Sequence, residues 1–95
     1  MNFSEKVYSL CRKIPKGKVT TYKMIAHKLR TKAYRAVGSA LRKNKDRGVP
    51  CHRVVCSDGS IGGYKGKKNS KEKIRLLRKE GVEIKKGKID LSKYL

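Results

Sequence analysis

Residues 21–43 read TYKMIAHKLRTKAYRAVGSALRK and carry the clearest structural pattern in the chain. Apolar residues recur there at helical spacing in two runs, which are Tyr22, Ile25, Ala26 and Leu29, then Ala33, Val37, Ala40 and Leu41. Thr21 and Thr31 are suited to cap the helices that follow them. We therefore expect one helix from Tyr22 to about Arg30 and another from Ala33 to about Lys43. Two short helices joined by a few residues suggest a helix-turn-helix, although helical hairpins are common in other proteins.

The segment before this pair predicts a further helix. Residues 2–14 place five apolar side chains on one helical face, namely Phe3, Val7, Leu10, Cys11 and Ile14. Asn2 and Glu5 have the spacing of a capping box, and Pro15 stops the helix. Cys11 is then expected in the core, the ordinary place of a free cysteine. Residues 19–20 are expected to form a short extended piece.

The segment after the pair predicts short strands. Residues 44–48 are polar and indicate a loop, and residues 49–50 must be extended because Val49 precedes a proline. Residues 53–56 are expected to form a short strand, and residues 61–64 a returning strand after a turn at 57–60. A basic loop is expected over residues 65–69.

The C-terminal third predicts one more helix and a hairpin. Ser70 can cap a helix that runs to Glu80, with Gly81 as its C-terminal stop. Ile74 and Leu77 would face inward. Apolar residues then alternate over 82–91 around Lys86-Gly87, which suggests a small hairpin.

The size and composition of the chain indicate one domain over residues 1–95. A chain of 95 residues is too short for two ordinary domains. Apolar residues make up 37% of it, with one Phe and no Trp, so Val, Ile, Leu, Ala and Tyr must build the core. No stretch approaches a membrane span, and the N-terminus lacks a signal-peptide pattern. We expect a soluble, cytoplasmic protein that makes no contact with membranes.

The charge of the chain is its strongest global feature. Lys and Arg number 27 against 7 Asp and Glu, a net charge of +20. Such a field repels copies of the chain, which favours a monomer, and attracts polyanions such as nucleic acid. Solubility, or the lysine enrichment of hyperthermophile proteins, would also explain the charge. Together with the helix pair, it predicts a mostly α fold with short β hairpins, a winged-helix-like or helix-turn-helix DNA-binding domain.

The three cysteines, Cys11, Cys51 and Cys56, do not suggest a disulfide framework or a metal site. Their number is odd, and no signal peptide accompanies them. A zinc site built on Cys51, His52 and Cys56 would lack a fourth ligand at a usual spacing. We expect no metal.

The stretch Val49-Pro50-Cys51-His52-Arg53-Val54 carries the chemistry. A thiol is a nucleophile only as thiolate, and its ordinary pKa is about 8.5, so it needs a base or a positive neighbour. Histidine can accept that proton near neutral pH. Consecutive strand residues point oppositely, so a water bridging Cys51 and His52 is the easier geometry. A buried structural cysteine beside a surface histidine is the alternative, and composition alone favours it.

The sequence resembles the O6-alkylguanine-DNA alkyltransferases, specifically their C-terminal active-site domain. Pro50-Cys51-His52-Arg53-Val54-Val55 resembles the motif around that family's acceptor cysteine. Further resemblances follow in family order over about residues 2–82, at Thr21–Ala26, Arg35–Ala40 with Asn44, Ile61–Gly66, and Lys71-Glu72 through Glu80-Gly81. The family's N-terminal domain has no counterpart in the 95 residues.

The resemblance implies a single-use DNA-repair reaction that requires no cofactor, because the damaged base itself donates the alkyl group. Cys51 would accept the alkyl group, His52 would remove its proton through a water, and Glu80 would orient His52. Asn44 would brace the turn that carries the cysteine. Tyr22 would donate a hydrogen bond to the leaving guanine. The carbonyls of Cys51 and Val54 would accept from the exocyclic amine of guanine, and the Lys65 N–H would donate to O6. Tyr64 belongs to the same loop as Lys65. Without the resemblance, Glu80, Tyr22 and Asn44 are better explained as a helix-terminal charge, a core aromatic and a helix C-cap.

The resemblance also implies how DNA is held. The family docks its second helix in the minor groove of double-stranded DNA and rotates the damaged nucleotide out of the stack. Arg35 would fill the vacated place, unless it is only a phosphate contact, and Gly38 and Ser39 would permit close approach. Ser4, Lys23 and Ser57 match positions that touch the DNA backbone.

The sequence departs from the family pattern at two places, and two other functions are compatible with it. Lys65 stands where relatives commonly have Ser. The loop over residues 45–49 lacks the extra proline-bearing residues of some relatives, and this shorter loop affects the width of the pocket. The chain also resembles the non-enzymatic alkyltransferase-like proteins, which flag lesions for other repair; there another residue, usually Trp, stands in place of Cys51. A general basic helix-turn-helix chromatin protein is a third hypothesis.

Overall fold

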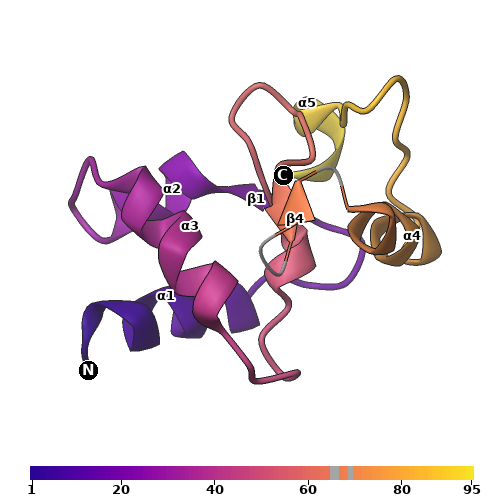
Figure 1. The fold of residues 1–95 in the computed structure, drawn as a ribbon. Helices are drawn as coiled ribbons and strands as arrows, with labels where there is room; N and C mark the ends of the chain where they lie inside the picture. The colour runs from indigo at the N-terminus through magenta and orange to yellow at the C-terminus, as the bar shows by residue number, and fades with distance from the viewer. Residues whose placement is uncertain (65–66, 69) are drawn as a thin grey trace.

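The computed structural model describes residues 1–64, 67–68 and 70–95, and the fold is mostly helical with short strands, as predicted (Figure 1). Its elements in chain order are α1 (Phe3–Arg12), β1 (Thr20–Thr21), α2 (Tyr22–Lys28), α3 (Tyr34–Lys43), the 3-10 turn η1 (Cys51–Arg53), β2 (Val54–Val55), β3 (Gly63–Tyr64), β4 (Lys67–Lys68), α4 (Lys71–Lys79) and α5 (Leu91–Tyr94). Helices α1 to α3 gather at one side, and α4 lies at the other, beyond the short strands.

The first two helices begin where their capping residues predict. Asn2 Oδ1 accepts from the Glu5 N–H at 2.8 Å, and Thr21 Oγ1 accepts from the Met24 N–H at 3.1 Å. Helix α2 ends at Lys28, earlier than expected, and Arg30 takes a left-handed conformation with φ 59°. The chain reverses there, which sets α2 against α3.

The cap predicted for the third helix is wrong. Helix α3 begins at Tyr34 with Ala33 at the N-cap position, where no side chain bonds the helix. Thr31 Oγ1 accepts instead from the Ala33 N–H at 3.1 Å. Thr31 lies two residues too early in the chain, so it closes the turn before the helix.

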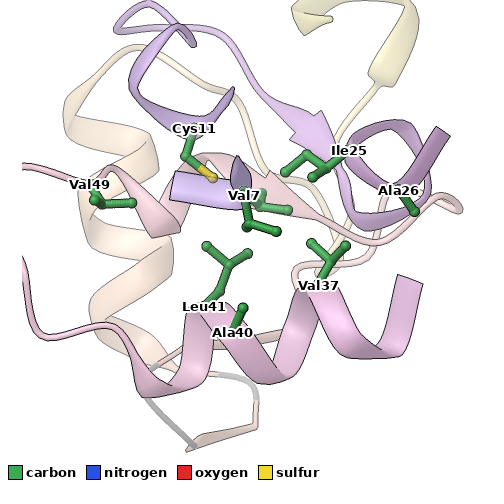
Figure 2. Close-up of a cluster of buried hydrophobic side chains, with 9 residues drawn as sticks. Val7, Cys11, Ile25, Ala26, Val37, Ala40, Leu41 and Val49 are labelled. Atoms are coloured by element: carbon green, nitrogen blue, oxygen red, sulfur yellow. The ribbon is translucent and has the colours of Figure 1, made fainter. Parts of the chain in front are cut away.

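The three helices enclose one of the two buried clusters found among the described residues. This first cluster is formed by Val7, Cys11, Ile25, Ala26, Val37, Ala40, Leu41, Val49 and Val54. Figure 2 shows side chains from α1, α2 and α3 pointing into the shared interior. Cys11 is fully buried, as predicted. The Tyr8 hydroxyl adds a 2.6 Å hydrogen bond to the Ala40 carbonyl, which ties α1 to α3.

The strands pair differently from the predicted hairpin over 53–64. Arg53 belongs to η1, and β2 pairs in parallel with β1, with Thr20 opposite Val54 and Thr21 opposite Val55. Residues 63–64 pair instead with residues 67–68, which were expected to be loop. Consecutive strand residues face opposite sides, and Val54 packs in the first cluster while Val55 packs in the second.

The C-terminal third closes the second cluster. Its buried members are Val19, Val55, Ile61, Leu77, Val82, Ile84, Ile89 and Tyr94. Helix α4 is capped as predicted, since Ser70 Oγ accepts from the Lys73 N–H at 3.4 Å and Gly81 follows at φ 93°.

The predicted tail hairpin is only partly correct. Lys86 and Gly87 both have positive φ and form the tight turn, but one bridge between Lys85 and Lys88 replaces a ladder within it. Helix α5 was not predicted; Asp90 caps it by accepting from the Ser92 N–H at 3.1 Å. In the part of the chain that is described, none of the helices has the length and apolar character needed to cross a bilayer.

Candidate active site at the Cys51 turn

Cys51 opens η1, at the point where the loop after α3 turns toward β2. Val49 is buried and Pro50 is half-buried, so the turn is anchored on the first cluster while Cys51 remains half-buried. A pocket of about 910 Å³ lies beside it. Leu41, Asn44, Pro50, His52 and Tyr64 are among the residues that line this pocket with Cys51. The thiol therefore has access to a cavity large enough for a small molecule or a nucleobase.

Asn44 braces the turn directly. Its Nδ2 donates to the Cys51 sulfur at 3.2 Å and to the Asp46 carbonyl at 2.9 Å, while its Oδ1 accepts from the Asp46 N–H at 3.1 Å. An amide N–H that points at sulfur stabilises the thiolate more than the thiol. Asn44 can thus hold both the shape of the loop and the charge of the nucleophile.

A carboxylate stands behind the imidazole. His52 Nε2 lies 3.0 Å from Glu80 Oε2, although its N–H direction is not aligned well enough for a regular hydrogen bond. Both side chains are largely buried, with 13% and 11% of their surfaces exposed. A carboxylate at this distance favours the tautomer that carries its proton on Nε2.

Arg53 holds Glu80 in this position, a role the sequence analysis missed. Its Nε and Nη2 donate to the two carboxylate oxygens at 3.0 and 2.7 Å, and its Nη1 donates to the Ile14 carbonyl at 2.8 Å. Bidentate guanidinium–carboxylate pairs fix orientation as well as charge. Burial alone would raise the pKa of Glu80, but the contacts with Arg53 and His52 lower it to about 2. Glu80 therefore stays ionised at neutral pH.

Tyr22 approaches the site from the first turn of α2. Its hydroxyl lies 3.4 Å from the Gly63 carbonyl, and the residue is not part of the pocket wall described above. Burial raises the pKa of Tyr22 to about 12, with smaller contributions from the cysteines. Gly62 has φ 75°, and a Cβ there would come within 3.3 Å of the hydroxyl and 3.1 Å of the Cys56 sulfur. The absence of a side chain at Gly62 therefore leaves room for the Tyr22 hydroxyl. The raised pKa keeps that hydroxyl protonated, so it can donate a hydrogen bond.

A buried lysine, Lys73 of α4, was also missed. Its side chain is fully buried, and Nζ donates to the Val54 carbonyl at 2.6 Å and to the Gly63 carbonyl at 3.1 Å. The ammonium lies 5.8 Å from the centre of the Tyr22 ring. Burial lowers the pKa of Lys73 to about 8. The signal was its spacing, because Lys73 precedes Leu77 by four residues and shares its inward face.

The other predicted site residues fall in three groups. Val54 is buried and its carbonyl is bound by Lys73, while Tyr64 lines the pocket. Lys65 lies outside the described residues. The predicted DNA contacts Lys23, Arg35 and Ser57 are exposed, whereas Ser4, Gly38 and Ser39 are half-buried. A Cβ at Gly38 would meet the Tyr22 ring only at 3.9 Å, so packing within the chain does not require glycine there.

The described residues contain no group of three His, Cys, Asp or Glu side chains arranged to hold a metal ion. The chemistry available is that of a thiol, an imidazole backed by a carboxylate, and an amide donor. Those groups together suit nucleophilic transfer to sulfur.

Residues 2–82 match the family described as "6-O-methylguanine DNA methyltransferase, DNA binding domain". The chain is 49% identical over 90 residues to a bifunctional methyltransferase/endonuclease of Picrophilus torridus, covering 93% of this chain and 30% of that protein. It is 51% identical over 83 residues to a methylated-DNA–protein-cysteine methyltransferase of Candida glabrata, covering 85% of this chain and 39% of that protein. The chain thus spans well under half the length of these two relatives.

Solved structures share the fold. S. pombe Atl1, in complex with damaged DNA containing O6-carboxymethylguanine, matches with a TM-score of 0.87 and 34% identity over 98% of this chain and 93% of that one. The O6-methylguanine-DNA methyltransferase of Pyrococcus kodakaraensis matches with a TM-score of 0.74 and 43% identity over 86% of this chain and 47% of that one.

Proposed function

Because the chain belongs to the 6-O-methylguanine DNA methyltransferase family, we propose that it transfers the alkyl group of O6-alkylguanine in DNA irreversibly onto its own Cys51. The observation that carries the proposal is that the half-buried Cys51 lines the same pocket as His52, whose imidazole lies 3.0 Å from an ionised Glu80. A structural cysteine would have no need of that arrangement.

The proton and the electron pairs balance without a cofactor. Glu80 favours the imidazole tautomer protonated at Nε2, which leaves Nδ1 free to accept the proton of Cys51 through a water. The thiolate forms a bond to the alkyl carbon, the bond from that carbon to O6 breaks, and its electron pair passes to guanine, which takes up a proton. Tyr22, with its raised pKa, stays protonated and can donate to the leaving base. The thioether product is not reversed by thiol exchange, so each molecule acts once.

Double-stranded DNA would be held by the pair α2 and α3. The damaged nucleotide must leave the stack, at a cost of a few kcal/mol, to bring its alkyl carbon to Cys51. Arg35, exposed near the start of α3, is suited to occupy the vacated space, and Lys23 to contact the backbone. Further candidate contacts with DNA are Ser4, Gly38, Ser39 and Ser57. We expect the chain to act as a monomer.

A lesion-binding module without transfer is the second candidate. The likeness to Atl1 over nearly the whole of both chains favours it. The cysteine at position 51, with the groups that would activate it, favours transfer.

Intact mass distinguishes the two candidates. After mixing with duplex DNA that contains O6-methylguanine, the protein should gain the mass of one methylene unit, at most once per molecule. Cys51→Ser should gain nothing, whereas Cys56→Ser should still be modified. An unchanged mass combined with tight, lesion-specific binding would overturn the transfer proposal in favour of the module.

Binding to DNA should weaken steeply with salt. Each phosphate neutralised lowers log K by roughly 0.9 per unit of log salt concentration, and the net charge of +20 supports several such contacts. Fluorescence anisotropy with an undamaged duplex, at a series of KCl concentrations, measures the slope. Lys23→Gln should reduce the slope by about one. A slope near zero would show that the basic charge serves some purpose other than DNA binding.

A further inference from the structure

The loop between α3 and η1, residues 44–50, is held in one shape by hydrogen bonds within it and by contacts with the rest of the fold. Asp46 Oδ1 accepts from the Gly48 N–H at 2.8 Å, and Asn44 exchanges two hydrogen bonds with the Asp46 backbone. Arg12 of α1 pairs with Asp46 Oδ2 at 3.0 Å, and Val49 is only 5% exposed. The residues on either side of Asp46 are therefore carried on a braced turn at the wall of the Cys51 pocket.

The charges on this wall are unequal. Arg42, Lys45 and Arg47 line the pocket, are exposed, and form no ion pair with any residue that the structure describes. Glu72 is the one carboxylate of the wall left without a described ion-pair partner. The remaining charged side chains of the wall are already engaged, Arg12 with Asp46 and Arg53 with Glu80. Three free cations face one free carboxylate.

A cleft lined by charges of one sign concentrates ligands of the other sign. We propose that this pocket favours O6-alkylguanines whose alkyl group carries a negative charge, with carboxymethyl as the smallest example. This inference rests on the proposed function, because it concerns the adduct presented to Cys51. The carboxylate of the adduct would lie toward Lys45 and Arg47 while its methylene carbon faces the sulfur.

The transfer itself is unchanged for such an adduct. The S–C bond forms at the methylene carbon, the C–O6 bond breaks, and its electron pair leaves on guanine, which takes up a proton. The carboxylate is a spectator that remains on the alkylated Cys51. Its attraction to the wall therefore helps binding and alignment without altering the bonds that form and break.

Lesion binding by the Cys51→Ser protein tests the inference without chemistry. Two duplexes of one sequence are compared, one with O6-carboxymethylguanine and one with the neutral O6-carbamoylmethyl analogue of nearly equal size. Contacts to phosphates are common to both and cancel in the ratio of affinities. We expect the charged lesion to bind about 3- to 10-fold more tightly at low salt, as for one or two partly exposed charge pairs, and the ratio to shrink as salt rises.

Substitution of the cations in the pocket wall tests whether they cause the preference for the charged lesion. In the Cys51→Ser background, Lys45→Gln with Arg47→Gln should bring the ratio close to one, while Lys86→Gln, on an exposed turn outside the pocket, should leave it unchanged. Equal affinity for the two lesions, or a ratio that survives loss of both cations, would overturn the inference. Failure of methyl transfer by the unsubstituted protein would overturn the proposed function alone, because the binding ratio does not depend on transfer.

Discussion

Glu80→Gln should slow alkyl transfer to Cys51 by about 10³- to 10⁴-fold, the loss seen when the orienting carboxylate of a catalytic triad is removed. The amide cannot stabilise the imidazolium, and it can present its NH₂ group to the ring and favour the wrong tautomer. The rate is measured in single turnover with radiolabelled O6-methylguanine DNA. Glu83→Gln, which removes an exposed carboxylate just beyond α4, should leave the rate unchanged.

The pH profile separates a lost base from a damaged fold. Glu80→Gln leaves Arg53 without its carboxylate partner, so the variant is first checked for cooperative thermal unfolding. Without an effective base, transfer depends on spontaneous ionisation of the thiol, and the deficit should shrink as pH rises toward about 8.5 or above. A deficit constant with pH, or a rate within a few-fold of the unsubstituted protein, would rule out the relay.

Much of the helical framework was predictable because its signals are local. Asn2, Thr21 and Ser70 each bond the helix N-terminus that follows them, as their spacing predicts. Cys11 is buried because its neighbours at helical spacing are apolar. The cap assigned to Thr31 failed because the length of the turn before α3 depends on how α2 and α3 pack, which no short window of sequence contains.

The strand pairing was not predictable, because its partners are distant in the chain. β2 pairs with β1 across more than thirty residues, and a two-residue strand carries no periodic signal of its own. Residues 53–56 and 61–64 looked like a hairpin because they flank a turn, but the 3-10 turn at Cys51 rotates the chain onto β1 instead.

The site residues divide in the same way. Cys51, His52, Asn44 and Glu80 were predicted through a family resemblance. The structure pairs Asn44 with Cys51 and His52 with Glu80, and it places Asn44, Cys51 and His52 on one pocket. Arg53 and Lys73 were missed, because a positive charge in a very basic chain is ordinarily solvated. Only the packing shows that these two are among its largely buried cations.

Lys73 should make the stability of the fold rise with pH between about 8 and 10.5. Its pKa is about 8 in the folded chain, mainly because of burial, against an ordinary value of 10.5. Below pH 8 both states carry the charge, and the folded state bears the full cost of burying it. Between the two values the folded lysine loses its proton while the unfolded one keeps it, so the unfolded state binds more protons and stability increases. The change is at most about 3 kcal/mol, a large share of the roughly 5–15 kcal/mol that stabilises a domain.

Lys73→Met makes this contribution measurable by difference. Urea unfolding of both proteins at pH 7.5, 9 and 10 gives the free energy of unfolding, and titration of Cys11 and Tyr22 is common to both and largely cancels. The free energy of unfolding of the unsubstituted protein, relative to that of Lys73→Met, should increase steadily as pH rises. Lys79→Met, an exposed substitution on the same helix, should show no such trend relative to the unsubstituted protein. If the difference stays flat, Lys73 does not hold its charge in the interior, and its bonds to Val54 and Gly63 cannot fix the strand beside Cys51 as an ammonium would.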